Sequence, residues 1–96
     1  RQVVPLVEAV RKMTQLPAQR LEAYVPAMKS KGRIAVGADA DITVFDPDKV
    51  LDRATFTEPT VTSVGIPFVL VNGTFVVRDG ALVPDVTPGR PVLAKP

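Results

Sequence analysis

An Asn-Gly pair inside the apolar stretch Phe68 to Val77 constrains the fold of this chain more than any other feature. Both central residues of a type I′ turn need positive φ, so Asn72-Gly73 predicts a two-residue β-hairpin. The turn length predicts the register, in which the pairs are Val71–Thr74, Leu70–Phe75, Val69–Val76 and Phe68–Val77. Because both faces of this hairpin are apolar, we expect it to be covered on both sides or to lie inside a sandwich.

Period-two alternation predicts further short strands before the hairpin. Ile34 and Val36 alternate with Ala35, and residues 40–46 alternate again, with Ile42 and Val44 on one face. A second turn at Arg78–Gly80 leads into residues 81–83. We expect residues 48–63 to be a loop with room for one helical turn, and the tail Pro84–Pro96, which has four prolines, to be extended.

The first third of the chain has a helical pattern instead. Apolar residues at i, i+4 and i+7 predict a helix over residues 3–14, with Pro5 tolerated in its first turn. A second, short helix is predicted over residues 16–23, where Pro17 suits a first helical position. Residues 24–32 are expected to be a loop, because Pro26 breaks a helix and Gly32 allows a turn.

The absence of histidine and cysteine limits the chemistry of the chain. Histidine is the commonest metal ligand and the usual general base near neutral pH. Without cysteine there are no disulfides and no thiolate metal sites. A metal site built only from this chain would need oxygen ligands alone.

Charge is unevenly distributed. Residues 1–33 carry seven basic and two acidic side chains, and residues 34–96 carry five basic and eight acidic ones. The basic residues are scattered among Val, Leu and Ala, and only Tyr24 could stack on a base, so the sequence predicts a solvated helix face and no nucleic-acid partner. No apolar run approaches the roughly 18 residues that span a bilayer, so no membrane partner is expected.

Three aspartates within eight residues, Asp39, Asp41 and Asp46, are the most suggestive candidate for a metal site. An EF-hand loop needs a glycine after the alternating carboxylates and a bidentate Glu at its twelfth position, and neither is present. Strand alternation would also place Asp41 and Asp46 on opposite faces. We therefore interpret the three carboxylates as turn residues that flank a strand.

Other motifs also fail to define a site. Gly32 and Gly37 have the glycine spacing of a phosphate-binding loop, but Ala38 and Asp39 replace its Lys-Ser/Thr. Asn72–Thr74 matches a glycosylation acceptor but coincides with the predicted hairpin turn. The five lysines lie in polar or turn contexts, which favours a surface location. The sequence therefore predicts no catalytic, no cofactor-binding and no metal-ligating residue.

Three stretches, residues 10–21, 31–48 and 65–92, nevertheless resemble the C-terminal end of metal-dependent amidohydrolases, and the resemblance runs over nearly the whole chain. Its most specific residues are Gly32, Ile34, Gly37, Ala40, Asp41, Ile42, Phe45 and Asp46, together with Val71-Asn72-Gly73 followed by Gly89-Arg90. The nearest branch is that of the D-aminoacylases (N-acyl-D-amino-acid deacylases), with dihydroorotase-like and hydantoinase-like relatives. Residues 22–31 form a longer stretch than in many of these relatives.

The resemblance implies an α+β fold, mainly β with N-terminal helices. Residues 1–31 would be the terminal helical segment and loop of the parent enzyme, and residues 32–96 the C-terminal part of a small β-sandwich. A catalytic (β/α)₈ barrel, which would hold zinc or another divalent metal on residues that precede this chain, would be absent. The implied activity of the parent enzyme is hydrolysis of C–N bonds other than peptide bonds, such as those of N-acyl-D-amino acids or cyclic amides.

A different class of function remains open from the residues alone, namely a stand-alone β-rich binding or interaction module. The chain begins with Arg1 and not with Met, which favours a fragment or a processed product. As a fragment it would have the rest of the barrel domain as its partner, would associate with itself when isolated, and would be cytoplasmic. Exposed strand edges and apolar patches promote such association.

Overall fold

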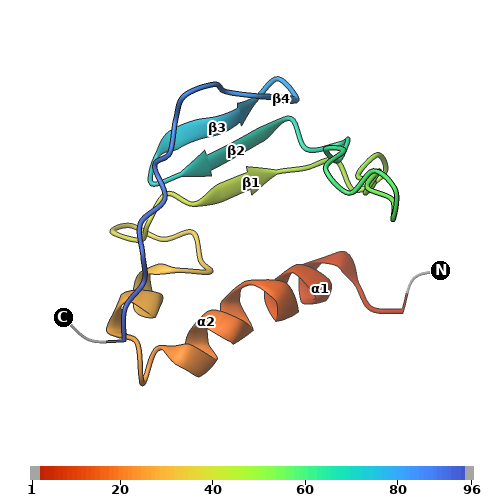
Figure 1. The fold of residues 1–96 in the computed structure, drawn as a ribbon. Coiled ribbons are helices and arrows are strands. Elements are labelled where there is room, and N and C mark those ends of the chain that lie inside the picture. The colour runs from red at the N-terminus through yellow and green to blue at the C-terminus, as the bar shows by residue number, and fades with distance from the viewer. Residues whose placement is uncertain (1–2, 95–96) are drawn as a thin grey trace. The chain divides into compact units, whose positions relative to one another are not determined.

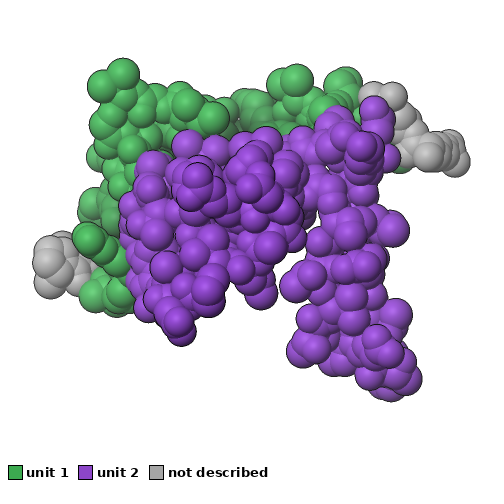
Figure 2. All heavy atoms as spheres, turned by 90° about the horizontal axis from the view of Figure 1, so that it is seen from above, with its two compact units in different colours: residues 1–39, 90–96 green, residues 40–89 purple. Residues whose placement is uncertain are grey.

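The computed structural model describes residues 3–94 of the chain. It divides into two compact units (Figure 2): unit 1 comprises residues 1–39 and 90–96, and unit 2 comprises residues 40–89. The predicted domain boundaries, 1–31 and 32–96, stay a prediction. No helix of the described part is long and apolar enough to cross a membrane.

Unit 1 contains the helices (Figure 1): α1 is Leu6–Met13, α2 is Gln15–Leu21, and the 3₁₀ helix η1 is Pro26–Ser30. α1 begins later than predicted because Pro5 lies before it as the N-cap residue with an extended backbone. Thr14 separates α1 from α2, and its hydroxyl donates a hydrogen bond to the carbonyl oxygen of Val10 at 2.7 Å. The two predicted helices are therefore present with shifted ends.

Two predictions for unit 1 were wrong. Pro26 opens a helical segment where a loop was expected, because its fixed φ suits the first turn of a helix. Residues 34–36 form no strand, and the side chains of Ile34 and Val36 are 90% and 108% exposed. A segment with period-two alternation forms a strand only where a neighbouring strand can hydrogen-bond to it. Residues 35–38 instead form a turn, in which the Ala38 N–H donates to the Ala35 carbonyl oxygen.

A close approach between Gly32 and α2 organises the rest of unit 1. Gly32 has a φ of +70°, and a Cβ at this position would lie 2.4 Å from the carbonyl oxygen of Thr14. Ala18 on α2 is 2% exposed and is the single buried residue among those that the structure describes. Arg33, which follows Gly32, binds the carboxylate of Glu22 at 3.1 Å.

Unit 2 is built on one antiparallel sheet whose strands follow each other in space as they do in sequence (Figure 1). β1 is Ile42–Val44, β2 is Phe68–Val71, β3 is Thr74–Arg78 and β4 is Ala81–Leu82. Ile42 pairs with Leu70, and Val44 pairs with Phe68. Helices followed by a separate antiparallel sheet confirm the predicted α+β class and the absence of a barrel from this chain.

The hairpin of β2 and β3 confirms the predicted turn and half of the predicted register. Asn72 and Gly73 have φ values of +50° and +77°, and the pairs Val71–Thr74 and Leu70–Phe75 form as expected. The pairs predicted for Val69 and Phe68 were wrong, because a β-bulge shifts the register and Val69 pairs with Val77. The bulge places Val76 as an extra residue in β3, which turn length alone cannot predict.

The second turn repeats the geometry of the first. Asp79 and Gly80 have φ values of +50° and +80°, and Arg78 pairs with Ala81 across them. The Gly80 N–H donates to the carbonyl oxygen of Pro67 at 2.9 Å, which ties this turn to the start of β2. The predicted second turn is therefore present and is followed by the short strand β4, and the described part of the tail after Pro84 contains no helix or strand.

Between β1 and β2 the chain leaves the sheet and returns. We call residues 51–64 the arm; it is the green segment beyond β1 in Figure 1. A single antiparallel bridge between Leu51 and Val64 closes its base. Further along, the Nε of Arg53 donates to the carbonyl oxygen of Thr62 at 3.1 Å, and the Glu58 N–H donates to the hydroxyl of Thr55 at 2.9 Å. The predicted loop is therefore held by hydrogen bonds within itself.

Candidate functional site

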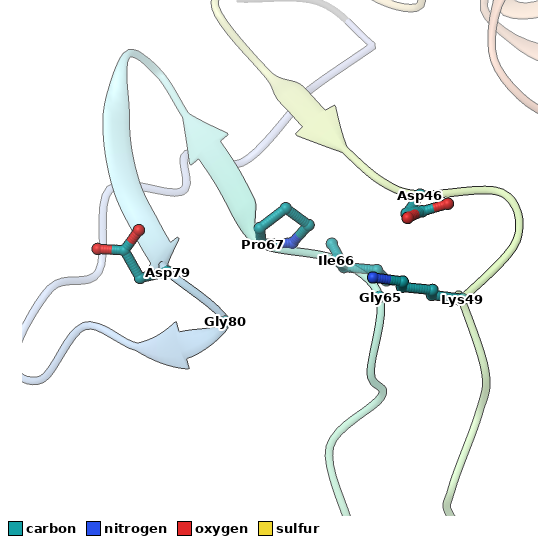
Figure 3. Close-up of a pocket in the computed structure, with 7 residues that line it drawn as sticks. All are labelled: Asp46, Lys49, Gly65, Ile66, Pro67, Asp79 and Gly80. Carbon is teal, nitrogen blue, oxygen red and sulfur yellow. The ribbon is translucent and has the colours of Figure 1, made fainter.

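A shallow hollow of about 300 Å³ lies at one end of the sheet in unit 2 (Figure 3). The loop after β1 contributes Asp46 and Lys49, the segment before β2 contributes residues 65–67, and the β3–β4 turn contributes Asp79 and Gly80. In Figure 3, Asp46 and Asp79 lie on opposite sides of the 65–67 segment. The two carboxylates therefore do not converge on one point.

The backbone around the hollow is held by hydrogen bonds and by one close approach. The carboxylate of Asp46 accepts the Asp48 N–H at 2.9 Å, and the Asp46 N–H donates to the carbonyl oxygen of Gly65 at 2.8 Å. Gly65 has a φ of +83°, and a Cβ there would lie 2.5 Å from the Cα of Val50. Asp46 thus ends the strand and shapes the loop that follows it.

The hollow has few groups that could do chemistry. Its side chains offer two separated carboxylates and one ammonium, but no imidazole, thiol or hydroxyl. A nucleophile would need an adjacent base, and general acid–base catalysis would need a group within hydrogen-bond reach of the substrate. No such pair lines this hollow, which leaves it a structural role at the end of the sheet.

The three candidate aspartates serve three different local structures. Asp39, in unit 1, forms an ion pair with Lys31 at 2.9 Å. Asp41, in unit 2, accepts the N–H of Asn72, and Asp46 forms the turn after β1. Among residues 3–94 the structure contains no group of three histidine, cysteine, aspartate or glutamate side chains that could hold a metal ion.

Hydrogen bonds join the Asn72-Gly73 turn to two other segments of unit 2. The Asn72 N–H donates to the Asp41 carboxylate at 2.9 Å, and the Gly73 N–H donates to the Ala40 carbonyl oxygen at 2.9 Å. The side-chain amide of Asn72 donates to the carbonyl oxygen of Pro88 at 2.7 Å. We call these three hydrogen bonds the turn latch, because they hold the hairpin tip between the segment before β1 and the segment after β4.

Large apolar side chains remain open to solvent in both units. On and before α1, Val3, Val7 and Met13 are 85%, 79% and 71% exposed, and at the tip of the arm Phe56 is 103% exposed. A self-contained domain encloses a core of its own, whereas Ala18 is the single buried residue in the described part of this chain.

Comparison with known proteins supplies the family. The model of the Amidohydrolase family matches residues 1–77 of the chain. The chain belongs to the amidohydrolase family. The match includes both helices, the arm and most of the β2–β3 hairpin, so membership rests on unit 1 and unit 2 alike.

The amidohydrolases compared below, which the chain resembles in both sequence and structure, are deacylases. The chain is 47% identical to the N-acyl-D-glutamate deacylase of Alcaligenes xylosoxydans xylosoxydans over 89 residues, and this match covers 93% of the chain. It is 45% identical over 69 residues, 72% of the chain, to the D-aminoacylase of the same organism. A crystal structure of D-aminoacylase superposes with a TM-score of 0.70 and 39% identity over 85% of the chain.

A fourth relative was crystallised with ligands. The N-acyl-D-glutamate deacylase of Bordetella bronchiseptica, in complex with zinc and a phosphonate inhibitor, superposes with a TM-score of 0.64 and 47% identity over 82% of the chain. The chain spans only 17% and 13% of the two Alcaligenes relatives and 16% of the two crystallised ones. It is therefore similar to a small part of each of these proteins.

The residues of this chain do not fit a metal centre of their own. The sequence has no histidine or cysteine, and the described carboxylates form no cluster of three. We accordingly assign no reaction step to a metal on this chain, and its expected lack of catalytic, cofactor-binding and metal-ligating residues stays a prediction. Local sequence patterns do not predict the turn latch, because the partners of Asn72 are 31 and 16 residues away from it.

Proposed function

We propose that this chain is the C-terminal structural portion of a metal-dependent N-acyl-D-amino-acid deacylase and supplies no reacting group itself. The observation that carries the proposal is the match to the Alcaligenes N-acyl-D-glutamate deacylase, which extends over 93% of the chain but only 17% of the relative. A segment of this size without histidine or cysteine is suited to a structural role.

The proposed role is to complete and support a larger fold. The four-stranded sheet would form part of a small β-sandwich whose other strands come from elsewhere in the polypeptide. Every strand residue is at least partly exposed, which supports a missing cover over the sheet. The exposed stripe of α1 would in the same way pack on the catalytic barrel, the proposed partner of this chain.

The metal belongs to the missing portion in this proposal. Zinc or another divalent ion would be bound in the barrel, where it would activate water for attack on the amide carbonyl. The zinc in the complex of the Bordetella deacylase supports a divalent metal. We include a cytoplasmic location in the proposal, which cell fractionation tests directly.

The decisive experiment uses the complete reading frame that contains this chain. We expect the purified protein to hydrolyse N-acetyl-D-glutamate or another N-acyl-D-amino acid and to discriminate against the L-enantiomers. We also expect stoichiometric divalent metal by elemental analysis and loss of activity after chelation. Absence of hydrolysis across a panel of N-acyl-D-amino acids and cyclic amides, with metal bound, would reject the proposed activity.

A second measurement tests the structural role. The isolated 96-residue chain should show no hydrolysis above a control that contains only the metal ion. As a positive control, this chain can replace the corresponding segment of the 47% identical Alcaligenes deacylase. A working chimera whose activity is lost on deleting the segment is the expected result; hydrolysis by the isolated chain would contradict the proposal.

A further inference from the structure

We propose that Asn72 is a deamidation site that the turn latch protects in the folded protein, and that deamidation, once it occurs, prevents the latch from re-forming. Asn72 is the only asparagine of the chain, and glycine follows it. This inference is independent of the proposed hydrolase function, because it concerns the chemistry of the chain itself.

The reaction is an intramolecular substitution that needs only water. The backbone nitrogen of Gly73 attacks Cγ of the Asn72 side chain, and a C–N bond forms to close a five-membered succinimide. The bond from Cγ to the side-chain nitrogen breaks, and this nitrogen leaves as ammonia with the proton given up by Gly73. Water then opens the ring to aspartate or isoaspartate. Glycine favours the attack because it has no Cβ to crowd the nitrogen.

In the folded turn, both reacting groups are engaged elsewhere. The attacking nitrogen donates its hydrogen to the carbonyl oxygen of Ala40 at 2.9 Å. The leaving amide nitrogen donates to the carbonyl oxygen of Pro88 at 2.7 Å. Attack requires the Gly73 nitrogen to give up its proton and approach Cγ, so it requires these bonds to break first.

The backbone of Asn72 is fixed as well. Its N–H donates to the Asp41 carboxylate at 2.9 Å, a charge-assisted bond that is stronger than a neutral one. The type I′ turn holds Asn72 and Gly73 at φ values of +50° and +77°. Succinimide closure therefore needs local opening of the hairpin tip, and its rate follows the population of open molecules.

The products do not fit the latch. An aspartate at position 72 has no side-chain N–H, so it faces the Pro88 carbonyl oxygen with a second acceptor and adds a negative charge close to Asp41. An isoaspartate adds a methylene to the backbone, which destroys the two-residue turn that sets the register of β2 and β3. A molecule that deamidates while the hairpin tip is open therefore cannot re-form the turn latch.

The test follows position 72 by peptide mass spectrometry in the complete polypeptide, aged at mildly alkaline pH with and without concentrated urea. We expect deamidation in native buffer to be at least about tenfold slower than in urea, because only opened molecules react. Equal rates in the two conditions would overturn the proposal. Deacylase activity is not a readout here, so failure of one proposal leaves the other intact.

Three variants show whether the latch gives the protection. Asp41→Ala should accelerate native deamidation by roughly fivefold or more, since a charge-assisted hydrogen bond is lost. Asp41→Asn, which keeps an acceptor oxygen, should restore most of the protection. Asp46→Ala is the matched control, because Asp46 also accepts a backbone N–H but lies outside the latch, and we expect it to match the wild-type rate. An Asp41→Ala rate no higher than that of Asp46→Ala would overturn the role of the latch.

The irreversible step has its own readout. A sample aged in urea can be refolded, and its folded fraction collected by size-exclusion chromatography. We expect isoaspartate at position 72 to be depleted from this fraction by about fivefold, since loss of the partly buried hydrogen bond to Pro88 and loss of the turn both oppose refolding. The same isoaspartate content in folded and unfolded fractions would contradict this part of the proposal.

Discussion

The rings of Phe68 and Phe75 face each other across the β2–β3 hairpin, with centroids 6.0 Å apart and planes inclined by 60°. The guanidinium of Arg78 lies 5.2 Å from the centroid of the Phe75 ring. These contacts span the β-bulge, so the two phenylalanines share a face although the register shifts between them. Tilted aromatic pairs and a cation over the ring each stabilise such a cluster.

Replacing Phe75 with alanine should therefore destabilise unit 2. Truncation of a fully buried Phe costs about 3–5 kcal/mol, and the partial exposure of Phe75 lowers our expectation to about 2 kcal/mol. Thr74→Ala, on an exposed neighbour in the same strand, should change the free energy of unfolding by less than about 0.5 kcal/mol. Urea denaturation of the complete polypeptide, with hydrogen exchange in β3 as the readout, measures the two losses of stability. Equal losses for the two variants would show that the aromatic cluster does not stabilise unit 2.

Alanine substitutions at two glycines with nearly the same φ distinguish the cost of backbone strain from the cost of steric crowding. A Cβ on Gly65, at a φ of +83°, would lie 2.5 Å from Val50, whereas Gly37, at a φ of +85°, has nothing within 4 Å. Both alanine variants incur the cost of a left-handed backbone, about 1 kcal/mol. Gly65→Ala should cost about 2 kcal/mol more than Gly37→Ala, because backbone atoms must move. Similar melting temperatures for the two variants would show that the loop at Val50 yields easily.

The ion pair of Arg33 and Glu22 should require arginine specifically. The Nε of Arg33 also donates to the carbonyl oxygen of Lys31 at 2.9 Å, and its Nη2 donates to that of Met28 at 3.4 Å, so one planar group joins three partners. Arg33→Lys should cost about 1 kcal/mol, because lysine cannot reproduce this fork. Arg11→Lys, in the exposed pair with Glu8 at 3.4 Å, should be nearly neutral. Thermal denaturation measures the loss of stability in each variant. An unchanged stability of Arg33→Lys would show that an ammonium group can replace the guanidinium here.

The isolated chain should associate with itself at micromolar concentration. The stripe of Val3, Val7 and Met13 is exposed, and β1 and β4 are the two edges of the sheet. Exposed edges and apolar stripes favour pairing between copies, most simply as a two-fold dimer, and exchange of an element between copies is one route to it. Sedimentation and light scattering measure the association.

The contrary result is equally informative. A monomer with protected amides along both α1 and the β2–β3 hairpin would show that the 96 residues close a core of their own. The same measurement on the complete polypeptide is the control, because its remaining residues should cover the stripe. An equally strong tendency to associate in both proteins would point to a surface that stays exposed in the complete polypeptide.

Local chemistry accounts for what could be predicted from the sequence. Asn72-Gly73 determines its turn through positive φ values, and the helical period of residues 3–14 places α1 within a few residues. The sequence has no histidine, which favours the absence of a metal centre built from this chain, and the expected absence of metal-ligating and catalytic residues remains a prediction. The resemblance to amidohydrolases was confirmed by the family match.

The features that could not be predicted from the sequence depend on pairing between residues far apart in the chain. Ile34 and Val36 alternate like a strand, yet no strand pairs with them and both are exposed. The bulge opposite Val69 depends on how the hairpin packs, which turn length does not encode. Asp41 was weighed as a metal ligand and proved to hold a turn 31 residues away, a partnership that no local pattern signals.

The arm has a practical consequence for engineering. Its base is closed by the Leu51–Val64 bridge, and the Arg53–Thr62 hydrogen bond braces it further out, so changes near Phe56 do not interrupt a strand of the sheet. Exposed loop tips are the positions where proteins best tolerate added sequence. An epitope or a fluorophore-labelling peptide spliced in beside Phe56 would therefore label this chain while β1 and β2 keep their pairing.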